Sequence, residues 1–312
     1  MRAVLFHNVV AEPTDQIDRS LERLHVNAFR RELEWLASRY RIVDHGDAMR
    51  ALDAGDDQPD AMVLTFDDGF AGVKDVAAPV LAELGLPAAV FVLTEPGGAM
   101  RADRLFHFER LEIAFRLAEG STIDLTAYGD GVLPFATPVA RLQALKGLKR
   151  RLKAMPDRAC VDARARIISA LGVSDEAIRV YASQSPKYHK LTLDDCRTLA
   201  AQGWTIGGHT RNHPSLGMST DTDIVDEVGG NADDLRAVGF AGVPFAYPYG
   251  GETHVDARVR AATRGAGFLC AWTTQPGDND RHTDRYALRR FSLPGLHHGD
   301  STLLNDHRSS PS

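Results

Sequence analysis

The sequence predicts an α/β fold, a distorted (β/α) barrel with a helical insertion, and three observations lead to this prediction. Short apolar runs of strand length alternate along the chain with segments of helical periodicity, as in parallel α/β folds. Capping and stop residues separate these segments. The 312 residues are 44% hydrophobic and 25% charged, which is enough to bury a large core without disulfides. We therefore expect one domain over residues 1–300, followed by a disordered tail at 301–312.

In the first third of the chain the predicted strands and helices alternate regularly. The expected elements are an apolar strand at 3–9, a helix capped by Asn27 and ending near Arg39, a strand from residue 41, a buried strand at 61–66, a helix at 72–84 stopped by Gly85, and a buried strand at 88–93. Strands buried on both faces are typical of a parallel sheet with helices outside it.

Residues 103–187 interrupt this alternation, because they predict two or three helices and a glycine-rich turn near Gly129 and Gly131. We expect a helical insertion between barrel strands. Insertions of this kind lie over the mouth of a barrel and often select the substrate. The alternation then resumes with a helix whose capping box is Thr192 and Asp195, a strand before His209, a helix at 255–263 and a strand at 267–272.

Polar side chains with metal-binding chemistry follow two of the predicted strands. Asp67 and Asp68 come directly after the strand at 61–66, and His209 and His213 follow a later one. Alone, an Asp-Asp-Gly sequence also fits an ordinary turn, and a His-x-x-x-His sequence also fits surface histidines. Two imidazoles and one carboxylate at strand ends, however, form a ligand set that leaves coordination positions open, as catalytic metal sites do.

Three segments together resemble one enzyme family. They are Thr65-Phe66-Asp67-Asp68-Gly69, His209-Thr210-Arg211-Asn212-His213-Pro214 and Phe245-Ala246-Tyr247-Pro248-Tyr249-Gly250. Their order and spacing are similar to those of the polysaccharide deacetylases, also called the NodB-homology or carbohydrate esterase family 4 enzymes. A histidine after the first strand resembles the circularly permuted subgroup related to poly-N-acetylglucosamine deacetylases. The resemblance covers nearly the whole chain and implies a barrel of the NodB-homology type with a single catalytic domain.

The resemblance implies roles for the aspartates and histidines of the first two segments. Asp68, His209 and His213 are expected to bind one divalent metal ion. Zinc is the first expectation, and iron, nickel and cobalt suit the same three ligands. Asp67 is then the general base that takes a proton from metal-bound water.

The third segment is expected to contact substrate through Tyr247, Pro248 and Tyr249. The resemblance assigns the backbone N–H of Tyr249 to the oxyanion of the tetrahedral intermediate. Pro248 has no N–H and fixes the turn.

Two further roles have more than one candidate in the sequence. For the general acid we prefer His7, because active residues of barrels gather at the C-terminal ends of strands. His297 and His298, in a loose match to the late Leu-x-His motif of the family, are the alternatives. The family arginine that orients the base is missing from the third segment, and Arg289 or Arg290 could reach the site from a late strand. The histidines outside these segments, including His25, His45, His107, His189 and His254, are expected at the surface.

The net charge of −6 gives no reason to expect nucleic-acid binding. Residues 141–153 are a local exception, since they are basic with leucines at helical spacing. This segment predicts either a solvated helix face that packs its leucines inward or a basic surface for anionic headgroups or a sugar-phosphate carrier. Cys160, Cys196 and Cys270 lack metal-type or redox-type spacing and are expected to be ordinary thiols of a reducing compartment. No secretory or transmembrane segment is visible, so we expect a cytoplasmic location, with peripheral contact to a lipid-linked substrate as one option.

The sequence therefore predicts a metal-dependent hydrolase that removes acetyl from an N-acetylated amino sugar, on a polysaccharide, a lipid-linked sugar or a small glycoside. Attack by metal-bound water needs no covalent acyl-enzyme. Two other classes stay open. One is an amidase of another non-peptide C–N bond, or an O-deacetylase, on the same site. The other is a noncatalytic carbohydrate-binding relative, which would need neither Asp67 nor an acid histidine. No sequence feature specifies the oligomeric state.

Overall fold

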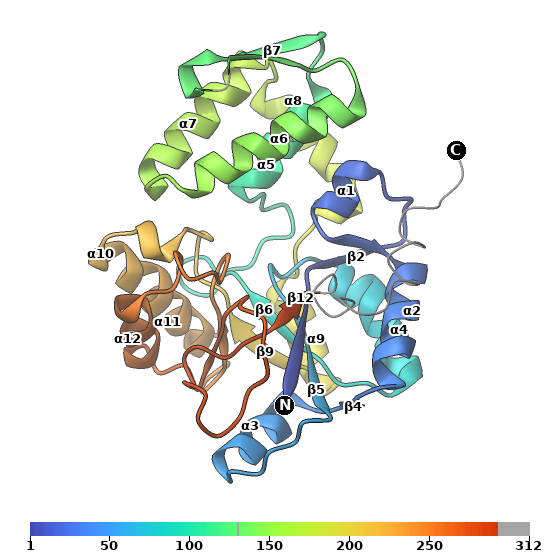
Figure 1. The fold of residues 1–312 in the computed structure, drawn as a ribbon, viewed down its shortest axis with the longest axis vertical. Helices are drawn as coiled ribbons and strands as arrows, with labels where there is room; N and C mark the ends of the chain where they lie inside the picture. Colours follow the sequence, from blue (N-terminus) through green and yellow to red (C-terminus); the bar gives the residue numbers. More distant parts are fainter. Residues whose placement is uncertain (130, 293–312) are drawn as a thin grey trace.

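One parallel, curled β-sheet organises the protein (Figure 1). The computed structural model describes residues 1–129 and 131–292. Neighbouring strands follow the order β11 (Ala271–Trp272), β10 (Phe245–Ala246), β9 (Thr205–Gly208), β6 (Ala89–Val92), β5 (Ala61–Phe66), β1 (Arg2–Phe6) and β12 (Phe291–Ser292), with β4 (Arg41–Ile42) paired to the start of β5. All pairings in this sheet are parallel, and within the described residues no pairing of β11 with β12 closes it. The predicted distorted (β/α) barrel is confirmed as a curled, open form.

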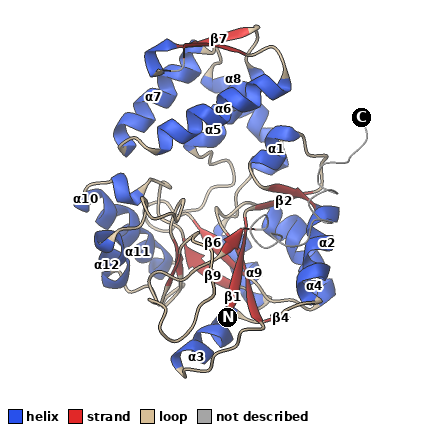
Figure 2. Cartoon of the chain, in the orientation of Figure 1, coloured by secondary structure: helices blue, strands red, loops and turns tan. Residues whose placement is uncertain are grey.

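Helices surround the sheet, as Figure 2 shows by colour. They are α2 (Val26–Ala37), α3 (His45–Asp53), α4 (Ala78–Leu84), α9 (Leu193–Ala201), α10 (Asp221–Ile224), α11 (Gly230–Ala237) and α12 (Ala257–Gly265). A π-helical turn at Val73–Ala77 leads into α4, and another at Val225–Gly229 joins α10 to α11. The predicted stop at Gly85 is confirmed, because this residue adopts the left-handed conformation at the end of α4.

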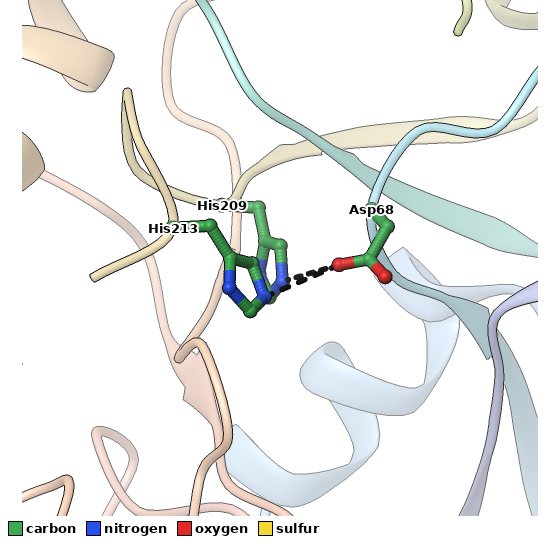
Figure 3. Close-up of side chains that lie close together, drawn as sticks. All are labelled: Asp68, His209 and His213. Atoms are coloured by element: carbon green, nitrogen blue, oxygen red, sulfur yellow. Dashed lines mark ion pairs between the residues drawn. The ribbon is translucent and has the colours of Figure 1, made fainter. Parts of the chain in front are cut away.

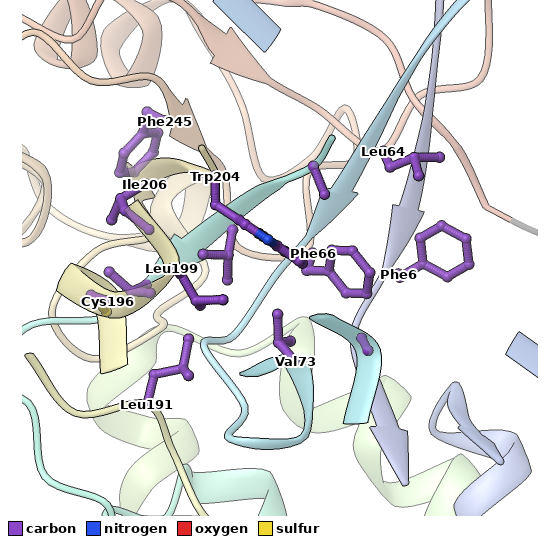
Figure 4. Close-up of a cluster of buried hydrophobic side chains, with 14 of the residues drawn as sticks. Phe6, Leu64, Phe66, Val73, Leu191, Cys196, Leu199, Trp204, Ile206 and Phe245 are labelled. Carbon is purple, nitrogen blue, oxygen red and sulfur yellow. The ribbon is translucent and has the colours of Figure 1, made fainter. Parts of the chain in front are cut away.

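The main hydrophobic core lies between the sheet and these helices (Figure 4). All six residues of β5 are buried. The rings of Phe6 and Phe66, from paired positions on β1 and β5, stack with centroids 5.2 Å apart, and Trp204 lies 5.6 Å from Phe66. Because β1 and β5 run parallel in this register, the residues after Phe6 and Phe66 emerge at the same edge of the sheet. This edge places His7 beside Asp67.

Residues of the predicted insertion form a second layer over that edge (green in Figure 1). It contains α5 (His107–Leu117), α6 (Pro138–Lys153), α7 (Asp157–Ala170) and α8 (Asp175–Ser183), and an antiparallel hairpin of β7 (Thr122–Leu125) and β8 (Gly131–Pro134). The expectation of two or three helices is thus too low, and the strands of the hairpin are unpredicted. These helices share a separate core, which also takes in Ile17 and Tyr188 from outside the insertion. Ile17 belongs to α1 (Gln16–Ser20), which lies next to a small parallel pair of strands, β2 (Asn8–Val10) and β3 (Arg23–His25).

Three local expectations are wrong for physical reasons. Asn27 does not cap α2, because the helix begins at Val26 and the Nδ1 atom of His25 accepts the capping bond from the N–H of Asn27. His45 is not at the surface. It is only 4% exposed, and its Nε2 accepts a hydrogen bond from Trp272, 3.2 Å away. The strand expected at 267–272 shortens to β11, since the ring of Phe268 packs into the core instead.

Among the described residues, no helix has both the length and the apolarity needed to cross a membrane. Cys160, Cys196 and Cys270 are buried, and no disulfide joins any two of them.

Candidate active site

The site lies where the loops after β1, β5, β9 and β10 converge. Residues with a left-handed backbone gather here, although their side chains disfavour it. In the described chain the non-glycine residues with positive φ are Glu22, Asp68, Thr210, His213 and Tyr249. Strained backbone of this kind persists only where the surroundings enforce it, and it clusters at functional sites. Four of these residues line a single cavity of about 470 Å³.

The side chains of Asp68, His209 and His213 point toward one another (Figure 3). The Oδ1 atom of Asp68 lies 3.3 Å from the Nε2 atom of each histidine, and the three candidate ligand atoms lie within 4.8 Å of one another. The Nδ1 atom of His209 lies 2.7 Å from the carbonyl oxygen of Ala246 and so carries the proton. That hydrogen bond leaves the Nε2 lone pair aimed at the centre of the group, as metal-ligating histidines require.

The charge states of this group suit a divalent cation. Although burial opposes it, the neighbouring imidazoles of His209 and His213 hold the pKa of the Asp68 carboxyl well below its usual range. Burial lowers the pKa of His213, which favours the neutral imidazole that a metal needs. One carboxylate and two imidazoles leave several coordination positions for other ligands. The residues present therefore fit the predicted metal ion.

Asp67 does not join this group, because Arg290 holds it. The guanidinium donates two hydrogen bonds to the carboxylate, 2.8 Å to Oδ1 and 2.7 Å to Oδ2. Both side chains are almost fully buried, at 3% and 0% exposure. Burial alone would raise the pKa of Asp67, but the charge of Arg290 outweighs it and the pKa is lowered. Of the two predicted arginines, Arg290 is therefore the one that orients Asp67, while Arg289 is exposed.

His7 follows β1 and lines the same cavity. Its Nδ1 atom lies 2.8 Å from the Oε2 atom of Glu22. Burial would lower the pKa of His7, but the charge of Glu22 raises it to about 9. The imidazole is thus protonated at neutral pH. His297 and His298, the alternative acids, lie outside the described residues.

Of the three predicted substrate contacts in the third segment, Tyr249 lines the cavity. Its ring packs edge-on against His213, with centroids 4.8 Å apart. The side chain of Tyr247 turns into the core, where its hydroxyl donates to the carbonyl oxygen of Tyr286 at 2.9 Å. Neither Tyr247 nor Pro248 is among the lining residues, so the geometry gives them a supporting place behind Tyr249.

The wall facing these loops comes from the insertion. Phe106 stacks on the ring of His213, with centroids 5.7 Å apart and planes 16° apart. Phe108 meets Tyr249 edge-on at 6.4 Å. Apolar rings against a metal-type ligand reduce its contact with water, which strengthens electrostatic interactions inside the cavity.

Comparison with known proteins gives a family match over part of the chain and a shared fold over most of it. Residues 175–271 match the family described as polysaccharide deacetylase, a range that includes His209, His213 and the third segment but not Asp67. Three solved structures share the fold over almost the whole chain. The Streptococcus pyogenes deacetylase PplD, in complex with acetate, has 15% identity, a TM-score of 0.56, and coverage of 94% of this chain and 92% of its own. IcaB from Ammonifex degensii has 16% identity, a TM-score of 0.56, and coverage of 95% and 92%. The de-N-acetylase from Aggregatibacter actinomycetemcomitans has 15% identity, a TM-score of 0.53, and coverage of 93% and 93%.

Residues 175–271 therefore match the polysaccharide deacetylase family in sequence, and the chain as a whole shares its fold with these three solved structures. No curated protein matches its sequence significantly. Glu22 is a site residue that the sequence did not indicate, because it lies outside the three segments that resemble the deacetylase motifs. It precedes β3, and only its left-handed backbone, invisible in the sequence, turns it toward His7.

Proposed function

We propose that this protein is a metal-dependent deacetylase that hydrolyses the acetamido group of an N-acetylated amino sugar. One observation carries the proposal. The metal-type group of Asp68, His209 and His213 lies beside a second carboxylate, Asp67, which is held apart by its own arginine. A structural metal site needs no carboxylate besides its ligands, whereas amide hydrolysis requires a proton acceptor next to the metal.

Asp68, His209 and His213 would hold the cation, with zinc the first candidate and iron, nickel or cobalt the others. When bound, the cation would supply Lewis acidity that lowers the pKa of water and polarises the amide carbonyl. The hydrogen bond from His209 to Ala246 keeps its imidazole in the required tautomer.

The residues of the chain divide the proton transfers between them. Asp67 takes a proton from the water that attacks the amide carbonyl, and Arg290 keeps its carboxylate ionised and oriented. His7 donates its proton to the amide nitrogen as the C–N bond breaks, and Glu22 keeps that imidazole charged until then. The N–H of Tyr249 stabilises the oxyanion. The products are acetate and the free amine, so the atoms balance without a covalent acyl-enzyme.

The test is acetate release from a panel of N-acetylated sugars, sugar nucleotides and glycosides. Zinc-loaded protein is expected to release acetate from at least one class, chelated protein to release none, and added zinc to restore the activity. O-acetylated sugars and small cyclic amides in the same panel test the alternative hydrolases. Hydrolysis of one of these without release from any N-acetylated sugar would replace the proposal. No hydrolysis by protein that has bound zinc would favour a carbohydrate-binding relative.

A further inference from the structure

The basic segment at 141–153 has a place in the cavity that its sequence did not indicate. It forms most of α6, with Leu142, Leu145, Leu148 and Leu152 buried as expected. Lys146 and Arg150 face solvent. Lys149 and Lys153, one turn apart, are half-buried and line the cavity that contains the candidate metal ligands.

Neither lysine is neutralised by a carboxylate. Within the described residues, no acidic side chain lies within 4.0 Å of either ammonium group, and both ammonium groups lie over aromatic rings. The Nζ atom of Lys149 lies 5.4 Å from the centre of Phe108. The Nζ atom of Lys153 lies 4.5 Å from the centre of Tyr249. Arg164, from the next helix, adds a third cation over Phe108 at 5.1 Å.

The acids that line the same cavity are already engaged. Their partners are His7 for Glu22, Arg290 for Asp67, His209 and His213 for Asp68, Lys190 for Glu109, and Arg23 for Glu112, at distances from 2.5 to 3.3 Å. No contact with a lining carboxylate therefore offsets the charge of either lysine.

This arrangement costs stability when no ligand is present. Like charges four residues apart on a helix destabilise it. Burial and the neighbouring charge of Lys153 lower the pKa of Lys149 to about 8. A bound anion would offset both effects, since an ammonium group attracts phosphate as a compact point charge.

One of the two lysines, Lys153, lies close to the candidate metal ligands. Lys153 is 4.5 Å from the centre of the Tyr249 ring, and that centre is 4.8 Å from the centre of the His213 ring. These two distances add to an upper limit of 9.3 Å between the ammonium and His213. A group on the deacetylated sugar or on its neighbour is therefore within reach of Lys153.

We propose that Lys149 and Lys153 form an anion subsite, and that the amino sugar deacetylated here carries a phosphate group on the same or the adjoining sugar. This inference rests on the proposed function and narrows its substrate to a phosphorylated N-acetylamino sugar. The insertion then selects the substrate by charge, through the face of α6 turned toward the barrel.

The kinetic test compares N-acetylglucosamine 1-phosphate with neutral methyl N-acetylglucosaminide, by kcat/KM of the zinc-loaded protein at fixed ionic strength. The wild type should prefer the phosphate by about tenfold or more, the size expected for charge-assisted contacts. A Lys149→Met/Lys153→Met variant should lose this preference. Lys146→Met, which removes the same charge from the solvent side of α6, should keep it. Lys149→Met alone keeps the contact between Lys153 and Tyr249, so a reduced phosphate preference in this variant comes from the lost charge and not from a disturbed Tyr249.

N-acetylmuramic acid tests whether the lysines bind a carboxylate instead of a phosphate. A higher kcat/KM for this sugar than for N-acetylglucosamine 1-phosphate would overturn the assignment of phosphate.

Calorimetric titration with N-acetylglucosamine 1-phosphate measures binding at the lysines independently of acetate release. Binding by the wild type and Lys146→Met, but not by the double variant, supports the subsite even when no protein releases acetate. Equal binding by all three, or equal preference in the wild type and the double variant, would overturn it. Thermal unfolding checks that the double variant is folded, and its midpoint should equal or exceed that of the wild type.

Discussion

Replacing Arg290 with Met should destabilise the protein more than any ordinary surface change. The substitution removes both hydrogen bonds from Asp67, whose carboxylate is 3% exposed and has no other side-chain donor among the described residues. Removing one partner of a buried ion pair costs about 3–5 kcal/mol, because the other charge stays buried. Arg289→Met is the matched control. The same substitution at this exposed neighbour should change the free energy of unfolding by less than about 0.5 kcal/mol.

Urea denaturation of the chelated proteins, followed by circular dichroism, measures these differences. A double variant, Arg290→Met with Asp67→Asn, removes the orphaned charge and should recover about 1–3 kcal/mol of the loss. The sign of the pH dependence follows from the lowered pKa of Asp67, whose ordinary value is 3.8. The pair contributes its full stability above that value and loses it as pH falls through the lower, folded pKa. The difference between wild type and Arg290→Met should therefore shrink in acid. Equal stability of Arg290→Met and Arg289→Met at neutral pH would refute this reasoning.

Three further predictions follow from the site and the fold. Zinc at 100 times its dissociation constant should raise the free energy of unfolding by about 2.7 kcal/mol in the wild type, and Asp68→Asn and His209→Ala should lose this effect. An equal zinc-induced rise of the thermal midpoint in these variants would contradict the ligand assignment. Glu22→Gln should move the basic limb of the pH profile of kcat/KM to lower pH, since the pKa of His7 is about 9 and the acid acts only below its pKa. An unmoved limb would remove His7 or Glu22 from the mechanism. Thr192→Ala should cost about 1 kcal/mol in urea denaturation, because it removes the capping box of α9, and an unchanged midpoint would show that the cap is dispensable.

The sequence predicts the sheet well because its signals are local. Residues 61–66 are apolar throughout and form a strand buried along its whole length. Thr192 and Asp195 form the predicted capping box. The hairpin of β7 and β8 escapes prediction, since each strand alternates exposed residues with buried or half-buried ones over only four positions.

In the candidate site, too, the residues with local sequence signals are predicted and those that depend on tertiary packing are not. Asp68, His209 and His213 follow strands, so parallel topology alone brings them to one edge. The partners of Asp67 and His7 depend on distant segments, and two adjacent arginines cannot be distinguished until the register of β12 sets which one turns inward. Tertiary packing also decides which way the side chain of Lys149 points. Its spacing from the leucines allows a solvated face, and only the docking of α6 over the barrel turns that face into the cavity.

The most direct test of Asp67 as the general base is acetate release by zinc-loaded wild type and Asp67→Asn, with the zinc content of each protein measured. The substrate is the N-acetylated sugar that the panel identifies. Asp67→Asn should retain zinc and lose about 10²- to 10⁴-fold in rate, the usual contribution of general base catalysis. Acetate release at the wild-type rate by zinc-containing Asp67→Asn would contradict this assignment.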